Sequence, residues 1–156
     1  MSKLIKFSRI LCPTFPLFSG WNWHAYILSL ATAACIWLAR HDKTKDEIKQ
    51  YIETTFGYDL SRTVDSIKPT YKFSSWCMTS VPESIICFLD SNSYEETIRN
   101  AVYLNGDTDT MAAIGGSIAL AYYKDIDDTL VKECMKKLPK EMIDIIVDFD
   151  TKFNMI

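Results

Sequence analysis

The sequence predicts an all-α, single-domain protein of 156 residues. Apolar residues recur three and four positions apart along most of the chain, and no stretch shows the alternation of a half-buried strand. Two boxes of the form Ser/Thr-x-x-Glu, at Thr44–Glu47 and Ser93–Glu96, are typical of helix N-termini. Only five glycines and five prolines leave little material for a loop-rich β fold.

The N-terminal residues 1–23 have no clean helical period and contain Pro13 and Pro16, so we predict an irregular lead-in there. The folded domain is expected over residues 24–156. Its first helix, over residues 25–39, is apolar almost all round, which predicts a helix buried in the centre of the domain. Its 15 uncharged residues are fewer than the ~18–20 that span a bilayer, so no membrane crossing is expected.

The next helices are predicted from their caps. The box at Thr44 opens a helix that ends at Gly57, where a glycine after the last helical residue is expected. Residues 58–80 are predicted to be irregular. Pro82 suits the first turn of a helix and is expected to open the third one. The box at Ser93 begins the fourth.

Three further helices are predicted after the fourth one ends near Asn105. Residues 107–123 are rich in Ala and Gly, aspartates at residues 125–128 favour a new N-terminus, and Pro139 starts the last helix. We expect the apolar faces of the last two helices to point inward. These faces consist of Leu130, Val131, Cys134 and Leu138, and of Met142, Ile143, Ile146, Phe149 and Phe153.

Charge is spread unevenly along the chain. The net charge is −3, and residues 79–156 carry 14 acidic and seven basic side chains. Proteins that bind nucleic acid are usually basic, so no nucleic-acid partner is expected. The acidic half either provides ligands for a cation or forms a solvated surface.

The five cysteines have no CxxC spacing, and two histidines add few ligands for a zinc site. Cys35, Cys87 and Cys134 each fall within a helical apolar pattern, and we predict that they are buried, reduced thiols. Reduced thiols are typical of the cytoplasm, where we expect the protein to reside.

The candidate functional site is the run NGDTDT at Asn105–Thr110. Two carboxylates two residues apart cannot share one face of a regular helix, but Asp107 and Asp109 can converge at a helix start and face one concave pocket. Free backbone N–H groups there stabilise ionised carboxylates. With the Thr110 hydroxyl they offer hard oxygen ligands, which suit Mg²⁺ or Mn²⁺. The alternative is a plain helix cap formed by Asp107.

Two adjacent glycines, Gly115 and Gly116, follow this run within the same predicted helix. Each costs the helix about 1 kcal/mol relative to Ala. Such a cost indicates either close packing against neighbouring helices or a ligand pressed against the backbone.

Three segments resemble those of ADP-ribosylglycohydrolases, a family that includes the dinitrogenase-reductase-activating glycohydrolase. The stretch AVYLNGDTDTMAAIGGSIALAYY is similar to the family's C-terminal metal motif, LGGDTDT followed by an Ala/Gly-rich helix ending in AYY. Residues 77–85, CMTSVPESI, resemble the family's SVPEA segment. His24 and the alanines after it resemble the helix that follows the family's HPEG loop. The resemblance covers residues 24–150.

The resemblance implies an all-α domain around a two-metal Mg²⁺ site, which holds the distal ribose of ADP-ribose while water cleaves the bond to the modified side chain. ADP-ribose or an ADP-ribosylated protein is then the expected ligand. By position, Asp107, Asp109 and Thr110 are expected to be metal ligands, and His24 is expected to lie near the substrate. The alternative for His24 is a structural role.

The chain departs from the family pattern in its N-terminal half, where the family carries an acidic catalytic residue and a Thr-Asp-Asp metal motif. No Thr-Asp-Asp occurs here, so we expect a domain truncated at its N-terminus, with half a site. Either another chain supplies the missing half, or this chain is a non-catalytic helical binding module or fragment. Truncation is expected to expose apolar surface around Trp21 and Trp23, which favours a partner chain or self-association. Asn105 stands where the family has Gly.

Overall fold

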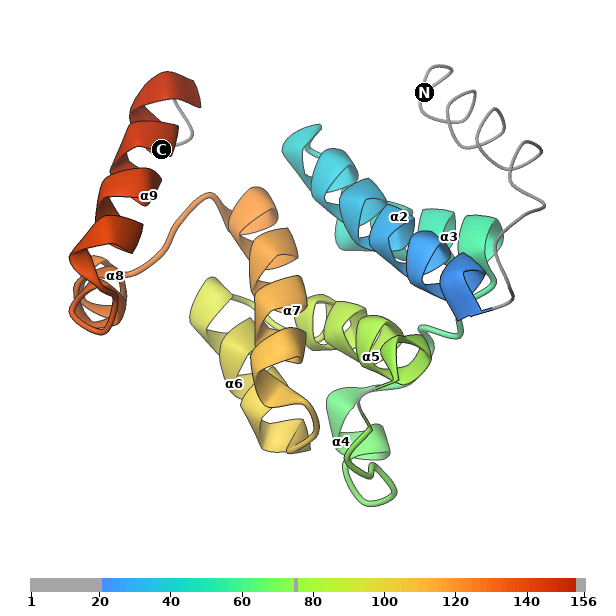
Figure 1. Ribbon diagram of the computed structural model, residues 1–156. Coiled ribbons are helices and arrows are strands. Elements are labelled where there is room, and N and C mark those ends of the chain that lie inside the picture. Colours follow the sequence, from blue (N-terminus) through green and yellow to red (C-terminus); the bar gives the residue numbers. More distant parts are fainter. Residues whose placement is uncertain (1–20, 75, 154–156) are drawn as a thin grey trace. The chain divides into compact units, whose positions relative to one another are not determined.

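The computed structural model describes residues 21–74 and 76–153, without the side chains of residues 21–28 and 77. The described residues form helices and no strands, which confirms the all-α prediction (Figure 1). The helices are α2 (Trp21–Arg40), α3 (Lys45–Phe56), α4 (Val64–Ile67), α5 (Cys77–Leu89), α6 (Tyr94–Leu104), α7 (Thr108–Tyr123), α8 (Asp128–Met135) and α9 (Lys140–Phe153).

The chain divides into two compact units, the first ending at Tyr123 and the second beginning at Lys124. In unit 1, α7 lies between α6 and α5 and also contacts α2 (Figure 1). The core of this unit is therefore built around α7. Burying each large aliphatic side chain contributes about 1.5–3 kcal/mol. The largest fully buried side chains include Ile48, Ile52, Ile85, Phe88, Leu104, Met111 and Ile118.

Helix α2 buries one face. Ala31, Ala34, Cys35 and Leu38 follow the helical period and are buried, and α2 contacts α3, α5 and α7. The opposite side is open at Ala33, so the expectation of burial all round is wrong for the described side chains. Neighbouring helices cover only one face of α2, although its apolar composition would allow burial on its other faces as well. No helix among the described residues is long and apolar enough to cross a membrane.

The start of α2 also differs from expectation. The helix begins at Trp21, although residues 21–23 were expected to belong to the irregular lead-in. No proline or glycine follows Gly20 in this stretch, so nothing in the backbone stops the helix from extending to Trp21. The rest of the expected lead-in, residues 1–20, lies outside the described residues.

The capping box of α3 is confirmed. Thr44 Oγ1 accepts a hydrogen bond from the Glu47 N–H at 3.3 Å, and the Glu47 carboxylate accepts one from the Thr44 N–H at 2.9 Å. The helix ends as predicted at Gly57, whose φ of 73° lies in the left-handed region. At the N-terminus of α3, Lys45 Nζ donates a hydrogen bond to the carbonyl oxygen of Leu89, the last residue of α5, at 3.0 Å. A cation is favourable at a helix C-terminus, so Lys45 ties α3 to α5.

Two boundaries between residues 58 and 89 differ from the prediction. The segment expected to be irregular contains the short helix α4, where Thr63 and Ser66 cap each other's backbone N–H groups. Helix α5 begins at Cys77, so Pro82 lies inside the helix and does not open it. The Trp76 carbonyl accepts the N–H groups of residues 79 and 80 and starts the helix earlier. Pro82 then costs α5 one backbone hydrogen bond.

Unit 2 consists of α8 and α9, and neither helix has a buried residue. The predictions that their apolar faces point inward and that Cys134 is buried are therefore wrong. A pair of helices this short cannot enclose a core of its own. Leu130, Leu138 and Ile143 are half-buried, and Cys134 is exposed. The other members of the two predicted faces are exposed: Val131, Met142, Ile146, Phe149 and Phe153.

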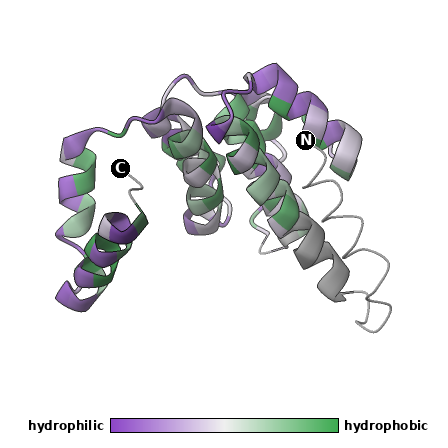
Figure 2. Cartoon of the chain, turned by 90° about the horizontal axis from the view of Figure 1, so that it is seen from above, coloured by the Kyte–Doolittle hydropathy of each residue, from purple (hydrophilic) through white to green (hydrophobic). Residues whose placement is uncertain are grey.

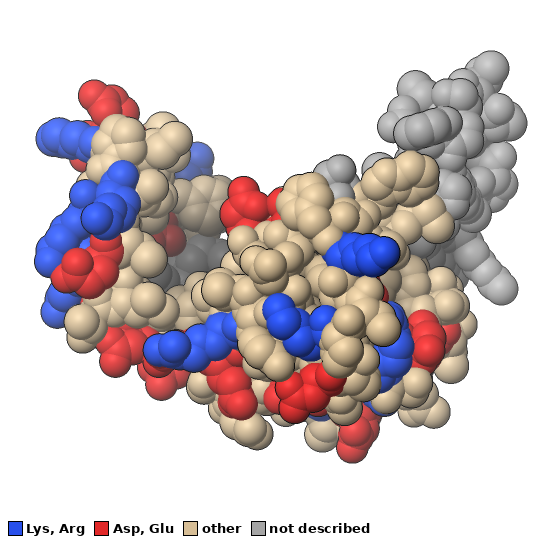
Figure 3. Space-filling view, turned by 90° about the horizontal axis from the view of Figure 1, so that it is seen from below, with Lys and Arg blue, Asp and Glu red and all other residues tan. Residues whose placement is uncertain are grey.

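Charged side chains are spread over the surface. Acidic and basic residues are interspersed on the face shown in Figure 3, and several form ion pairs within one helix, such as Lys43 with Glu47 and Arg99 with Glu95. Most acidic side chains after residue 79 are exposed in the described part of the chain. The acidic surplus is therefore largely a solvated surface, apart from the carboxylates described next.

Candidate functional site

The NGDTDT run spans the connection between α6 and α7, residues 105–107, and the first three residues of α7. Asn105 ends α6 in the left-handed conformation with φ 61°, which asparagine tolerates better than most residues other than glycine. Asp107 immediately precedes α7, and its carbonyl accepts the Met111 N–H at 2.9 Å. The motif therefore lies at a helix start, as predicted.

The structure brings the carboxyl groups of Asp107 and Asp109 together at the N-terminus of α7. A hydrogen bond with the Asp107 side chain and the backbone N–H groups of Thr110 and Asp109 lower the pKa of Asp109. Asp107 is half-buried, whereas Asp109 and Thr110 are exposed. Two carboxyls this close repel each other unless a proton or a cation lies between them, so the pair suits a hard cation. That the pair faces one concave pocket stays a prediction.

Among the described residues, no three His, Cys, Asp or Glu side chains are grouped so that they could hold a metal ion. The assignment of Asp107, Asp109 and Thr110 as ligands of a metal ion therefore stays a prediction. His24 lies on α2, but its side chain is outside the described part, so its place near the substrate stays a prediction.

Tyr71 supports the motif from a segment that sequence reasoning treated only as irregular. A Cβ atom built on Gly106 would lie 2.5 Å from the Tyr71 ring, so only glycine lets the two approach. The Tyr71 hydroxyl donates a hydrogen bond to the Met111 sulfur at 3.4 Å. Burial raises the pKa of Tyr71, and the negative charges of Glu83 and Asp107 add to this effect. A tyrosine in an irregular stretch carries no sequence signal for this role.

Replacing Gly106 with Ala is expected to push the Tyr71 ring away and to lower the free energy of unfolding by about 1–2 kcal/mol, the cost of overpacking. Urea denaturation of the variant and the wild type measures this difference. The matched background is Tyr71→Leu, in which the same Gly106→Ala change should cost clearly less because the ring is gone. An equal loss in both backgrounds would contradict the role assigned to Tyr71.

The glycine pair of α7 is explained by helix packing. A Cβ atom on Gly115 would lie 3.1 Å from the carbonyl oxygen of Ser84 on α5, and one on Gly116 would lie 2.9 Å from Ile98 Cδ1 on α6. Of the two alternatives left open by the sequence, the structure confirms close packing. The small residues of α7 let α5 and α6 approach the helix that carries the two carboxylates.

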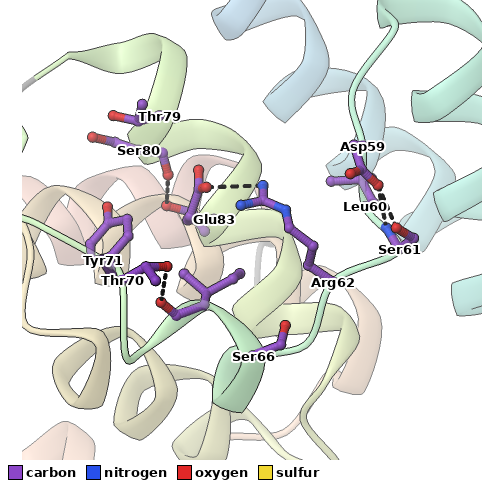
Figure 4. Close-up of polar contacts among 12 residues, drawn as sticks. Asp59, Leu60, Ser61, Arg62, Ser66, Thr70, Tyr71, Thr79, Ser80 and Glu83 are labelled. Atoms are coloured by element: carbon purple, nitrogen blue, oxygen red, sulfur yellow. Dashed lines mark hydrogen bonds and ion pairs between the residues drawn. The ribbon is translucent and has the colours of Figure 1, made fainter.

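A buried ion pair anchors the SVPE segment on α5. Glu83 is only 6% exposed, and its Oε1 accepts a hydrogen bond from Arg62 Nη2 at 3.0 Å (Figure 4). Its other oxygen, Oε2, is buried and has no hydrogen-bond partner among the described residues. Burial raises the pKa of Glu83, while the positive charge and hydrogen bond of Arg62 act in the opposite direction. Arg62 was not singled out in the sequence, where no spacing links it to Glu83.

Two of the predicted thiols are confirmed as buried and free. Burial raises the pKa of Cys35 and of Cys87 to about 12, which leaves both thiols protonated at neutral pH. Protonated thiols are poor nucleophiles and poor metal ligands. These cysteines therefore serve the core of unit 1 and take no part in the candidate site.

Comparison with known proteins gives one match. The model of the ADP-ribosylglycohydrolase family matches residues 23–153, a range that includes the NGDTDT run and the SVPE segment. No curated protein and no solved structure matches the chain. With a match of this length and an all-helical structure, the chain belongs to the ADP-ribosylglycohydrolase family, a membership that supports a glycohydrolase-like function on ADP-ribosylated substrates.

Proposed function

We propose that this protein binds Mg²⁺ and ADP-ribose as an ADP-ribosylglycohydrolase-like protein whose own residues form part of a hydrolase site. Asp107, Asp109 and Thr110 would hold the ion, with Mn²⁺ as the alternative metal. One observation carries the proposal: Asp107 and Asp109 flank the first residue of α7, so both lie at a helix N-terminus, where the Asp107 side chain lowers the pKa of Asp109. Their hard oxygens match the ligand preference of Mg²⁺.

The residues around the motif favour this role. Backbone N–H groups at the start of α7 stabilise the ionised carboxylate of Asp109, which is the form that binds a cation. Packing of Tyr71 against Gly106 supports the turn that leads into α7. When bound, the metal supplies a template for the ribose and Lewis-acid polarisation. The ligand that fits this chemistry is the distal ribose of ADP-ribose, free or attached to a protein.

We further propose that the chain alone is an incomplete or degenerate enzyme. The sequence has no Thr-Asp-Asp, and three oxygen ligands from one short motif should hold Mg²⁺ weakly, because the ion keeps its waters unless several carboxylates converge. A second chain carrying the other half of the site would complete it. The same observation favours the second candidate function, a non-catalytic helical module that binds a partner.

Calorimetric titration of Mg²⁺, and then of ADP-ribose, into the purified protein tests the proposal. We expect Mg²⁺ binding with a dissociation constant on the order of millimolar, and ADP-ribose binding only when Mg²⁺ is present. Asp107→Asn and Asp109→Asn should each abolish both. The matched control is Asp128→Asn, which changes a first-turn aspartate of α8. Mg²⁺ binding without ADP-ribose binding would favour the interaction module, and no effect of the Asp107 change would exclude the site.

A further inference from the structure

A short segment between α3 and α5, residues 62–71, links the SVPE segment to the NGDTDT run within unit 1. At its start, Arg62 forms the ion pair with Glu83 on α5 (Figure 4). At its end, Tyr71 packs against Gly106, the residue before the first of the two aspartates. The segment therefore reaches from α5 to the turn that carries the candidate metal ligands.

This segment is fixed to unit 1 along its length. Val64 and Ile67 of α4 are buried in the core, and the Val64 N–H donates a hydrogen bond to Asp90 Oδ2 at 2.7 Å. Beyond α4, the Tyr71 N–H donates to the carbonyl oxygen of Ile67 at 3.0 Å. Because its backbone is held at both ends, the segment provides a fixed support for the groups that it contacts.

Lys68 contacts the chain where it leaves α6. Its ammonium group donates hydrogen bonds to the carbonyl oxygens of Tyr103 and of Leu104, the last residue of α6, the second at 3.5 Å. The same group lies 4.9 Å from the centroid of the Tyr103 ring, a cation–π contact. The carbonyl groups at a helix C-terminus lack partners in the helix and favour a cation. Lys68 therefore fixes the end of α6 immediately before the turn.

Tyr71 contacts the turn itself and the first part of α7. Its ring lies so close to Gly106 that a Cβ atom there would be 2.5 Å from Tyr71 Cε1, and its hydroxyl donates to Met111 Sδ at 3.4 Å. Both aspartates lie between Gly106 and Met111 in the sequence. Together with Lys68, Tyr71 thus holds the chain on both sides of the two carboxylates.

We propose that Lys68 and Tyr71 are positioning residues for a divalent cation: they hold the turn so that Asp107 and Asp109 are in place before the ion binds. The proposal rests on the metal site of the proposed function. Ligands that are already ordered bind more tightly, because binding then costs less conformational entropy. Neither residue is a ligand of the ion in this arrangement.

The positive charge of Lys68 separates this role from a direct electrostatic effect. A positive charge near two carboxylates competes with a bound cation, so removing that charge should by itself strengthen metal binding. Weaker binding after the loss of the Lys68 ammonium group therefore reports a change in the position of the turn.

Titration of Mn²⁺ into the full chain, followed by the electron paramagnetic resonance signal of the free ion, tests the proposal. Lys68→Met and Tyr71→Leu should each raise the dissociation constant about tenfold, the effect expected when a group that supports metal ligands is lost. Tyr71→Phe keeps the ring against Gly106 and should retain most of the affinity.

The matched control is Lys45→Met. Lys45 is half-buried like Lys68 and donates to a carbonyl oxygen at the C-terminus of a helix, in this case α5. Its ammonium group lies 5.5 Å from the ring of Tyr123, at the opposite end of α7 from the turn. It opens α3, a mostly hydrophilic helix (Figure 2), and its replacement should leave the Mn²⁺ affinity unchanged.

Amide hydrogen exchange of the metal-free protein gives a second measurement. Lys68→Met and Tyr71→Leu should speed exchange of the Met111 N–H, which bonds to the Asp107 carbonyl, at least about tenfold by loosening the turn. Lys45→Met should instead speed exchange of the Asp90 N–H at the end of α5.

The outcomes separate this proposal from the proposed function. If the wild type binds Mn²⁺ and both variants bind it equally well, the positioning role is overturned and the metal site stands. Weaker binding without faster exchange at Met111, or equal weakening in Lys45→Met, would also overturn the positioning role. A wild type that binds no Mn²⁺ would refute the metal site and this proposal with it.

Discussion

Incubated with Mg²⁺ and ADP-ribosylated protein, the purified chain is expected to release ADP-ribose at least about 10⁴-fold more slowly than a complete enzyme of the family. General-base help alone is worth roughly 10²–10⁴-fold, and misplacing the ribose costs about another 10²-fold. The chain offers the carboxylates of Asp107 and Asp109 but no Thr-Asp-Asp to complete a two-metal site. The combined loss should bring turnover close to the uncatalysed background.

Chromatographic detection of free ADP-ribose measures this rate. Substrates carrying ADP-ribose on arginine and on serine should be compared, because membership of the family does not specify the linkage. Mixing the chain with a separate chain that carries the other half should raise the rate, and Asp107→Ala should abolish the increase. Fast Mg²⁺-dependent release by the chain alone, lost in Asp107→Ala, would refute the prediction and establish a working enzyme.

Replacing Arg62 with Met is expected to lower the free energy of unfolding by about 3 kcal/mol at neutral pH. The change leaves the carboxylate of Glu83, 6% exposed, without its counter-charge. Breaking a fully buried pair costs about 3–5 kcal/mol, and the lower end applies because the Arg62 side chain is 41% exposed and already shares its charge with water.

The loss should depend on pH. Burial raises the pKa of Glu83 above its ordinary value of 4.5, so the folded protein binds this proton more tightly than the unfolded chain does. Stability therefore falls as pH rises from about 4.5 through the folded-state pKa. Arg62 lowers the pKa of Glu83, so removing Arg62 raises the folded-state pKa further and widens the pH range over which stability falls. The difference in the free energy of unfolding between Arg62→Met and the wild type should shrink below pH 4.5, because Glu83 is protonated in both proteins there.

Urea denaturation at several pH values measures these differences. Glu83→Gln removes the charge and should rescue most of the loss caused by Arg62→Met. The matched control is Arg99→Met, which breaks an exposed pair with Glu95 on one helix and should cost no more than about 0.5 kcal/mol. A loss in Arg62→Met that is independent of pH and is not rescued by Glu83→Gln would show that packing, and not the buried charge, carries the effect.

Local chemistry made the helix ends predictable from the sequence. The Thr44 box, Gly57 and Asn105 act on backbone groups within a few residues of themselves, so their pattern needs no knowledge of the fold. The placement of Asp107 and Asp109 at the start of α7 was predictable for the same reason. The short helix α4 was missed because it is capped by a Thr–Ser pair and not by a Thr–Glu box.

Contacts between distant segments were decided only by the tertiary structure. Nothing in the spacing of Arg62 and Glu83, or of Tyr71 and Gly106, indicates that they meet, since each pair is joined by the packing of separate elements. The same packing settled the role of the glycine pair on α7. Periodicity likewise shows that α9 has an apolar face but not which surface covers it.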